Sequence, residues 1–232
     1  MIMGDRRTKE TIRWGMVGGG KGSQIGYIHR SAAMRDGYFD LVAGAFDIDP
    51  DRGAAFGAAL GLDPARCYGD YAAMFAGEAA RADGIRAVSI ATPNNTHYAI
   101  TKAALEHGLH VVCEKPLTFT TAQAQELERL ARDKDRVVGV AYGYSGFPMI
   151  EQARQMVAAG VLGEIRLVNL QFAHGFHSAA VEANDPGAAW RMKPETSGPS
   201  YVLGDIGTHP LYLSEVICPD LKIKRLMCAR QS

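Results

Sequence analysis

The sequence has little that would commit it to nucleic acid, to a membrane or to secretion. Its 25 basic and 25 acidic residues cancel, so no net charge attracts a polyanion or an anionic lipid surface. Charge or glycine interrupts every apolar run well before the roughly 18 residues that a membrane-spanning helix needs. The first fourteen residues carry four basic side chains and lack the apolar segment of a secretory signal. We therefore expect a cytoplasmic protein with neither nucleic-acid nor membrane partners.

Cysteine is also scarce, with four residues in a chain of 232, and none of the four is paired in the C-x-x-C spacing that holds a metal or a redox disulfide. We expect no metal site, and small buried side chains at Cys67, Cys113, Cys218 and Cys228. What the chain does have is 47% apolar and 22% charged residues, the composition of a folded globular protein. At about 150 residues per domain, its length allows one complete domain and part of a second, or one large domain.

Short apolar runs alternate with helical segments up to about residue 145. The predicted strands are residues 12–17, 39–46, 87–91, 110–113 and 137–141, and the predicted helices are residues 24–34, 51–60, 96–106 and 121–133. Strands that are apolar on both faces are typical of a parallel sheet buried between two helix layers. The pattern predicts an α/β protein whose residues 1–143 form a doubly wound parallel sheet, the Rossmann fold.

The pattern changes after Tyr144. Helices are predicted for residues 147–159 and 205–216, and strands for residues 164–172 and 221–228. Apolar and polar residues alternate in the first of these strands, which is typical of a mixed or antiparallel sheet with one exposed face. Residues 144–232 are therefore expected to form a partial α+β domain with a mixed, largely antiparallel sheet. Residues 174–200 are rich in Gly, Pro and polar side chains and predict a loop close to a ligand.

The strongest local signal is a glycine-rich segment between the first predicted strand and the first predicted helix. Gly18 and Gly20 supply two glycines of a G-x-G-x-x-G loop, whereas Ser23 stands in the third place and Gly26 follows three positions later. A diphosphate needs backbone N–H groups close to its oxygens and a positive helix N-terminus, which residues without a Cβ allow. If Gly26 takes the helix-packing role of the third glycine, the loop is longer than usual. The alternative is that the segment is a plain structural turn without a ligand. We expect a dinucleotide to contact Gly18, Gly20, Ser23, Gln24 and Ile25.

Asp47 ends the second predicted strand, where an acid can accept hydrogen bonds from ribose hydroxyls and repel a 2′-phosphate. Once the longer glycine loop is allowed for, its separation from Gly20 is close to that of the dinucleotide-binding motif. This favours NAD over NADP, although Arg52 keeps NADP open. The alternative is that Asp47 only begins the turn before Asp49 and Pro50.

Two further segments follow central strands, at the edge where doubly wound sheets bind ligands. Thr92 and Asn94 are candidates for contact with the dinucleotide, and an ordinary turn with an Asn cap is the competing interpretation. Glu114, Lys115 and Pro116 follow the next strand. Partial desolvation beside a cofactor lowers the pKa of a lysine toward neutrality and suits it to acid–base work, although the tripeptide alone would more often hold a surface lysine.

The motifs follow one another in a fixed order along the chain. The glycine loop and Asp47 come first, and the later motifs are Thr92-Pro93-Asn94 with His97, Glu114-Lys115-Pro116 and Gly204-Asp205-Ile206-Gly207-Thr208-His209. From about residue 12 to its end, the sequence closely resembles the Gfo/Idh/MocA family of NAD(P)-dependent oxidoreductases, which act mostly on sugars and polyols such as glucose and inositol. The resemblance implies NAD as the cofactor, with NADP as the second option. It also implies cofactor contacts from Thr92, Asn94, His97, Glu114 and Lys115.

The resemblance implies catalytic roles as well. In that family the lysine of Glu-Lys-Pro lies beside the nicotinamide and the reacting carbinol, which carries over to Lys115, and the later acid and histidine carry over to Asp205 and His209. Loss of hydride from a C–H(OH) carbon requires a base within about 3 Å of the hydroxyl. An imidazole, with an ordinary pKa near 6.5, suits that role at neutral pH. Asp205 is expected to orient the histidine or a substrate hydroxyl, and Pro210 to end or kink the helical turn there.

The chain departs from the family pattern at the long glycine loop and at Tyr144, where many relatives have a basic or amide residue, so the choice of substrate stays open. An aromatic ring and an arginine in the predicted loop suit a sugar ring and its hydroxyls, and ordinary loop packing is the alternative. The residues in question are His174, His177, Trp190 and Arg191.

The leading hypothesis is a dehydrogenase that transfers hydride between a sugar or cyclitol secondary alcohol and NAD(P). An NAD-dependent glycosidase of the same family and a noncatalytic dinucleotide-binding regulatory protein are the alternatives. The second domain is substantially longer in the family than the 89 residues that follow residue 143 here. We therefore expect a C-terminally truncated chain with an unpaired sheet edge and exposed apolar surface. The full-length protein is expected to be a homo-oligomer.

Overall fold

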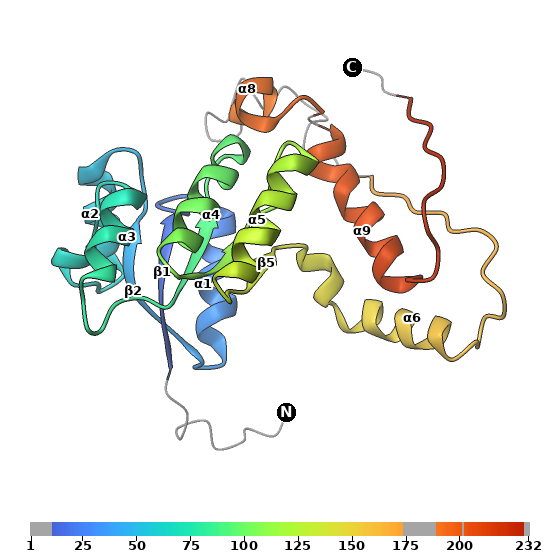
Figure 1. The fold of residues 1–232 in the computed structure, drawn as a ribbon, viewed down its shortest axis with the longest axis horizontal. Helices are drawn as coiled ribbons and strands as arrows, with labels where there is room; N and C mark the ends of the chain where they lie inside the picture. Colours follow the sequence, from blue (N-terminus) through green and yellow to red (C-terminus); the bar gives the residue numbers. More distant parts are fainter. Residues whose placement is uncertain (1–10, 174–188, 201, 230–232) are drawn as a thin grey trace. The chain divides into compact units, whose positions relative to one another are not determined.

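The computed structural model describes residues 11–173, 189–200 and 202–229. The chain divides into two compact units (Figure 1). The first comprises Met1–Ala141 and Trp190–Pro199, and the second comprises Tyr142–Ala189 and Ser200–Ser232. Within the described ranges, no helix combines the length and the apolar character that crossing a bilayer requires.

The first unit is built on a five-stranded parallel sheet in the order β2-β1-β3-β4-β5. The strands are β1 (Ile12–Gly18), β2 (Phe39–Ala45), β3 (Ala87–Ala91), β4 (His110–Cys113) and β5 (Val138–Val140). The chain starts in the middle of the sheet, adds β2 on one side and then crosses to β3 on the other. This reversal creates the crevice between β1 and β3 where sheets of this kind bind ligands. The predicted doubly wound sheet is confirmed, with strand ends that differ by at most one residue.

Five longer helices connect these strands: α1 (Gln24–Arg35), α2 (Pro50–Ala59), α3 (Tyr71–Ala79), α4 (His97–Glu106) and α5 (Thr121–Asp133). Side-chain oxygens of Ser23, Asp49, Asp70 and Thr120 accept hydrogen bonds from first-turn N–H groups of four of them. Short 3-10 turns precede α3 and α4, as η2 (Pro64–Arg66) and η3 (Asn94–Thr96). The four predicted helices are confirmed within a residue or so, whereas α3 was not predicted.

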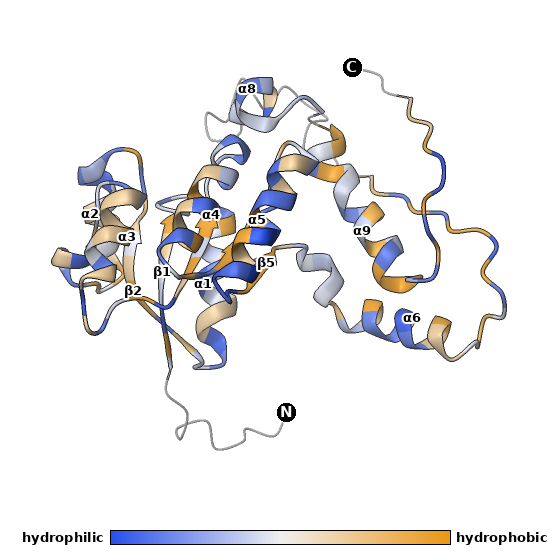
Figure 2. Cartoon of the chain, viewed as in Figure 1, coloured by the Kyte–Doolittle hydropathy of each residue, from blue (hydrophilic) through white to orange (hydrophobic). Residues whose placement is uncertain are grey.

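The helices cover the sheet on two sides, because right-handed crossovers send α1 to one face and α3, α4 and α5 to the other. One core cluster joins β-strand residues such as Ile90 to Phe75, Leu105 and Leu127 of α3, α4 and α5. A second cluster, which contains Trp14 and Met16 of β1, packs against residues of α1 and α2. Figure 2 shows the result as hydrophobic strands flanked by helices that carry hydrophilic residues.

A buried ionic cluster ties α3 to its surroundings. The Glu78 carboxylate at the end of α3 is 2% exposed and accepts hydrogen bonds from the Arg66 guanidinium, the Tyr68 hydroxyl at 2.9 Å and the Ile85 N–H at 3.1 Å. Arg66 is 6% exposed and also reaches the Asp83 carboxylate at 3.3 Å. Charges this deeply buried are tolerated only when their hydrogen-bonding capacity is met, as it is here.

The cysteines differ in environment. Cys113 and Cys218 are buried as expected, whereas Cys67 is half-buried and Cys228 is exposed. Burial raises the pKa of the Cys113 thiol to about 12, so it stays protonated at neutral pH.

The second unit contains η4 (Gly143–Gly146), α6 (Pro148–Ala158), the π-helical turn η6 (Leu203–Gly207) and α9 (Thr208–Ile217). The predicted end of the helix at Pro210 is wrong, because α9 runs through this residue. Helical residues run without a break from residue 202 to residue 217, so Pro210 lies within this run, three residues after the π turn. The irregularity lies instead in the π turn just before α9.

The mixed sheet predicted for residues 144–232 is not confirmed. In the part of the second unit that the structure describes, residues 164–172 and 221–228 form no strand. Leu167, Leu226 and Met227 in these segments are 83%, 75% and 97% exposed. Apolar alternation gives a strand one apolar face, but a strand forms only when a neighbouring strand takes up its backbone hydrogen bonds. Neither segment finds such a neighbour among the described residues.

Candidate functional site

The glycine loop lies at the carboxyl ends of three strands. Gly18 ends β1 beside Ala91 of β3, and the Gly19 N–H donates to the Ala91 carbonyl oxygen at 3.1 Å. Gly18 and Gly19 have positive φ angles of 72° and 68°, which residues with a side chain rarely adopt. The loop thus turns sharply from the sheet into α1 at the crevice between β1 and β3.

Glycine is required in this loop because backbone fills the space around it. A Cβ on Gly18 would lie 2.6 Å from the Ala91 oxygen, and one on Gly20 would lie 2.6 Å from the Phe46 oxygen after β2. A Cβ on Gly26 would clash with the Gly19 carbonyl. Gly26 therefore occupies the helix-packing position of the longer loop. This close-packed turn at a helix N-terminus fits the diphosphate of a dinucleotide, which must approach backbone N–H groups directly.

The remaining predicted residues of this loop form the start of α1. Ser23 is the N-cap, and its hydroxyl oxygen accepts a hydrogen bond from the Gly26 N–H at 3.0 Å. Gln24 and Ile25 follow in the first turn of the helix, where backbone N–H groups are available to an anion. Arg30 was not predicted as a site residue. Its guanidinium donates a hydrogen bond to the Gly19 carbonyl at 2.6 Å and so stabilises the glycine loop. Its guanidinium also lies 5.0 Å from the centre of the Phe56 ring.

Asp47 follows β2 and is bound on several sides. The Arg52 guanidinium donates to its carboxylate at 2.8 and 3.3 Å, and the Asp49 N–H donates to it at 3.0 Å. The hydrogen bond from Arg52 is the main reason that the pKa of Asp47 lies below its ordinary value. The contact with Asp49 is the turn that the alternative interpretation of Asp47 expected, while the acid remains at the strand end where a ribose would lie.

Thr92 and Asn94 follow β3, and each has a protein partner. The Thr92 hydroxyl lies 2.7 Å from the Thr96 hydroxyl. Asn94 is 5% exposed, and its amide donates to the Ser197 carbonyl of α8 (Pro194–Ser197) at 3.1 Å. Asn94 does not cap α4, whose N-cap is Thr96. Its side chain instead anchors a segment that lies more than a hundred residues further along the chain.

His97 is fully buried between the ends of β3 and β4. Its Nδ1 lies 2.8 Å from the Pro116 carbonyl oxygen and its Nε2 lies 2.9 Å from the Thr92 carbonyl oxygen. Both carbonyls only accept hydrogen bonds, so these contacts favour a protonated ring, whereas burial favours the neutral one. Burial outweighs the contacts, and the pKa of His97 lies below its ordinary value.

The depressed pKa of His97 predicts that folding stability falls as the pH drops from about 7 to about 5. Below the ordinary histidine pKa of about 6.5, the unfolded chain takes up a proton that the folded chain does not, at a cost of up to about 1.4 kcal/mol per pH unit. His110, whose pKa is also lowered by burial, contributes in the same direction. The His97→Gln variant should show a shallower loss of stability, measured as urea midpoints across this range. The same substitution at the exposed His107 is the control. If the urea midpoint falls equally steeply with pH in His97→Gln and in wild type, His97 is not the source of the pH dependence.

Glu114 and Lys115 follow β4 at the same edge of the sheet. Glu114 accepts the Lys115 N–H at 3.2 Å, and its other carboxylate oxygen lies 3.0 Å from Nε2 of His29 on α1. His29 also contacts Ser89 of β3. The Glu-Lys-Pro segment is thus connected to both β3 and α1. Neither His29 nor Ser89 was predicted, because the contacts join residues 60 and 85 positions apart.

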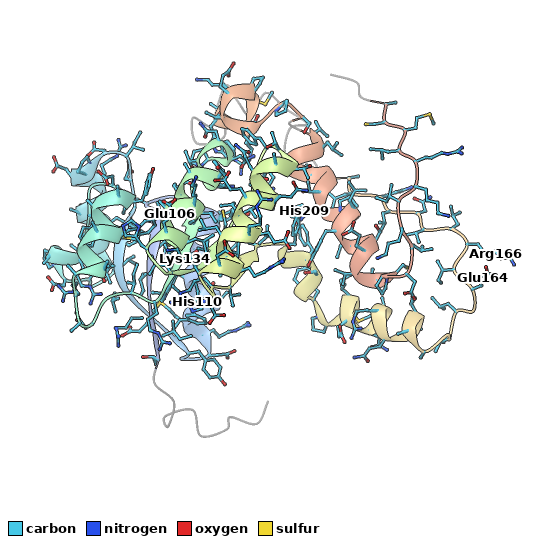
Figure 3. All side chains as sticks on the ribbon, viewed as in Figure 1. Glu106, His110, Lys134, Glu164, Arg166 and His209 are labelled. Atoms are coloured by element: carbon cyan, nitrogen blue, oxygen red, sulfur yellow. The ribbon has the colours of Figure 1, made fainter. Side chains whose placement is uncertain are left out.

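In the second unit, His209 lies near the start of α9 (Figure 3), and this residue is 9% exposed. The Tyr144 ring meets it edge-on with centroids 4.7 Å apart, Tyr142 does so at 6.0 Å, and the Phe172 ring stacks on it at 6.0 Å. The ring of His209 is therefore held by aromatic neighbours from two segments, the turn around η4 and the segment that contains Phe172. Asp205 lies in the π turn directly before α9.

Lys115 thus belongs to the first unit, whereas Asp205 and His209 belong to the second. Of the predicted loop residues, Trp190 and Arg191 lie in the short turn η5 (Ala189–Met192), where the guanidinium stacks 4.6 Å from the indole ring. His174 and His177 lie outside the described residues. In the ranges that are described, no group of three or more His, Cys, Asp or Glu side chains could hold a metal ion.

Comparisons with known proteins bear on the identity of both units. The oxidoreductase family with an NAD-binding Rossmann fold, Gfo/Idh/MocA, matches residues 12–142, and the Gfo/Idh/MocA C-terminal domain matches residues 150–231. The uncharacterized oxidoreductase YfiI of Bacillus subtilis is 55% identical over all of this chain and 60% of its own length. Levoglucosan dehydrogenase of Pseudarthrobacter phenanthrenivorans is 32% identical over 57% of this chain and 33% of its own length.

Solved structures give the same result. An inositol dehydrogenase homologue from Azotobacter vinelandii in complex with NAD⁺ has a TM-score of 0.94 and 66% identity, over 96% of this chain and 57% of that one. The same kind of homologue in complex with NADH and myo-inositol has a TM-score of 0.90 and 66% identity, over 96% and 56% of the two chains. The present chain therefore spans about three-fifths of the length of these relatives.

The chain belongs to the Gfo/Idh/MocA family of oxidoreductases. The resemblance inferred from its motifs is confirmed, and so are the predicted Rossmann fold and the expectation of NAD as the cofactor.

Proposed function

We propose that this chain carries the cofactor site and proton-transfer residues of a dehydrogenase that moves hydride between a sugar or cyclitol secondary alcohol and NAD. The observation that carries the proposal is the glycine turn at the crevice between β1 and β3, with Lys115 beyond the adjacent β4. Dinucleotides bind at this edge in doubly wound sheets. A cyclitol is favoured as substrate because a homologue with 66% identity was solved with NADH and myo-inositol.

The proposed chemistry divides between the two units. When bound, NAD would accept the hydride from the carbinol carbon. The hydroxyl proton leaves as the carbonyl forms, and we assign its transfer to Lys115 and His209, because lysine and histidine side chains serve as general acids and bases. The aromatic neighbours of His209 hold its ring in one orientation. Asp205, in the turn before it, would orient the histidine or a substrate hydroxyl.

Cofactor contacts are proposed on the same basis. The loop residues Gly18 and Gly20 and the first-turn residues Ser23, Gln24 and Ile25 would hold the diphosphate. Asp47 would accept the ribose hydroxyls. Thr92, Asn94, His97 and Glu114 would shape the nicotinamide side, with Asn94 and His97 acting through the backbone segments that they anchor.

The test is reduction of NAD by the complete chain in the presence of a panel of sugars and cyclitols that includes myo-inositol. NADH formation with one of them is the expected result. Hydrolysis of a chromogenic glycoside without net NADH would contradict the proposal in favour of a glycosidase that retains its cofactor. Tight NADH binding without turnover of any member of the panel would contradict it in favour of a regulatory dinucleotide-binding protein.

The Asp47→Ser variant is expected to lower the preference for NADH over NADPH by at least about tenfold, which corresponds to about 1.4 kcal/mol. Loss of the carboxylate removes repulsion of a 2′-phosphate and frees the Arg52 guanidinium to pair with it. Dissociation constants from cofactor fluorescence measure the effect without turnover. Asp49→Ser is the matched control, because serine also caps α2, and it should leave the preference unchanged. An unchanged preference in Asp47→Ser would remove Asp47 from the ribose site.

A further inference from the structure

A histidine whose side chain is largely covered connects α1 to the segment that follows β4. Nε2 of His29 lies 3.0 Å from the Glu114 carboxylate, and Nδ1 of the same ring contacts the Ser89 hydroxyl on β3. The side chains of His29 and Glu114 are 8% and 14% exposed, and Ser89 is 4% exposed. Three elements that lie far apart in the sequence therefore meet in one hydrogen-bonded chain.

Strand geometry explains why these residues meet. Val88, Ile90 and Cys113 belong to the core cluster on the side of α3, α4 and α5. Successive side chains of a strand point to opposite faces, so Ser89 and Glu114 point to the face that α1 covers. His29 lies on α1, which carries it to both partners.

The direction of each hydrogen bond follows from the chemistry of the partners. A carboxylate only accepts hydrogen bonds. The hydrogen of this pair is therefore on Nε2 of His29, which donates the hydrogen bond to Glu114. Nδ1 of a neutral ring is then an acceptor for the Ser89 hydroxyl. The order serine, histidine, acid is that of hydrolase triads, but Ser89 is buried within a central strand, where no substrate reaches it. These hydrogen bonds therefore do not activate Ser89 as a nucleophile. Their effect is to hold the Glu114 carboxylate in place.

Glu114 transmits this constraint to the next residue. One of its carboxylate oxygens is held by His29 and the other accepts the backbone N–H of Lys115 at 3.2 Å. We propose that His29 is a positioning residue, which fixes the backbone of Lys115 through the Glu114 carboxylate. This inference rests on the proposed function, because only a catalytic Lys115 makes its position matter for turnover.

The link also joins two parts of the proposed cofactor site. α1 begins at the glycine loop, and its next residue after His29, Arg30, donates to the Gly19 carbonyl. His29 thus ties the element under the diphosphate site to the element that carries Lys115. A small displacement of a reacting group costs as much as about a hundredfold in rate, whereas cofactor affinity depends on many contacts. Loss of His29 should therefore lower kcat more than it weakens cofactor binding.

The experiment compares two substitutions at His29 in the complete chain. Phenylalanine keeps the ring but cannot donate to Glu114, whereas the amide of glutamine can donate from nearly the same place as Nε2. Amide hydrogen exchange of Lys115, without cofactor, is the first readout. In His29→Phe exchange at Lys115 should quicken by about tenfold, while His29→Gln should stay within about twofold of wild type. His107→Phe, at an exposed histidine, is the matched control and should change neither.

Kinetics with the alcohol identified by the activity panel give the second readout. His29→Phe should lower kcat by about 10- to 100-fold, with partial rescue in His29→Gln and with NADH affinity within about threefold of wild type. Unchanged protection of the Lys115 amide in His29→Phe would overturn the proposal, even if the variant were less stable. Equal loss in both variants would also overturn it. If no alcohol is oxidised by the wild type, the proposed function fails, yet amide exchange still decides whether His29 fixes Lys115.

Discussion

Replacement of Lys115 by methionine is expected to lower kcat by about 10²- to 10⁴-fold, the range that general acid–base catalysis contributes. Methionine has a similar length but can neither donate nor accept the proton that leaves the substrate hydroxyl. Its backbone can keep the hydrogen bond from the N–H of residue 115 to the Glu114 carboxylate, so the segment after β4 should retain its structure. Dissociation constants for NADH should therefore stay within about threefold of the wild-type value.

The matched control is Lys134→Met, at an exposed lysine that ends α5, which should leave kcat unchanged. Steady-state kinetics and NADH fluorescence titration on the same preparations separate the two effects. Full activity in Lys115→Met would remove the lysine from the reaction. Parallel losses of activity and NADH binding would mean that it holds the cofactor and does not transfer a proton.

Glu78→Gln is expected to lower the free energy of unfolding by about 3–5 kcal/mol, the usual cost of removing one partner of a buried ion pair. The substitution preserves shape but leaves the Arg66 guanidinium, which is 6% exposed, without its buried counter-charge. It also replaces an acceptor for the Tyr68 hydroxyl and the Ile85 N–H with an amide, whose nitrogen cannot accept. Urea denaturation at neutral pH measures the change.

Glu128→Gln provides the comparison for this substitution. Glu128 pairs with Arg132 one turn away on α5, and both side chains are mostly exposed at 66% and 74%. Exposed pairs of this kind contribute about 0.3–0.5 kcal/mol, so the midpoint should hardly move. Equal effects of the two substitutions would show that the cluster around Glu78 adds nothing beyond an ordinary surface pair.

The Rossmann unit was predictable because its signals are local. The strands are continuous apolar runs, and a serine, aspartate or threonine stands at the N-cap of each predicted interstrand helix. The helix α3 escaped this reasoning, because a glutamate in a short, Ala-rich apolar segment breaks the expected stripe. Only the fold brings Arg66 to Glu78 and makes that acid a buried residue.

Predictions about the second unit were less accurate for a different reason. The alternation of apolar and polar residues in 164–172 and 221–228 indicates which side chains could share one face of a strand. A strand also requires a neighbouring strand that takes up its backbone hydrogen bonds, and the sequence alone does not identify that neighbour. The helices α6 and α9 depend on contacts within a few turns and were found. Proline was expected to end the helix at Pro210, but α9 continues through it after the π turn at Leu203–Gly207.

The sequence predicted which residues of the candidate site follow the strands. It did not predict the hydrogen bonds and ion pairs that connect them. Sequence reasoning named Gly18, Asp47 and Lys115 from their places after strands. It could not show that Arg52 already holds Asp47 or that His29 holds Glu114, because these are side-chain contacts set by packing. A histidine one turn beyond Gly26, on the helix that leaves a glycine loop, is the local signal that could have drawn attention to His29.

The most direct test of hydride transfer uses a substrate labelled at the reacting carbon. The complete chain is mixed with NAD and with sugars and cyclitols, myo-inositol among them, that carry deuterium on their ring carbons, and the reduced cofactor is analysed by mass spectrometry. The account predicts that the reduced cofactor carries deuterium from one of these alcohols and that Lys115→Met abolishes most of the transfer. A chain that binds NADH, yet transfers deuterium from none of them, would contradict the account.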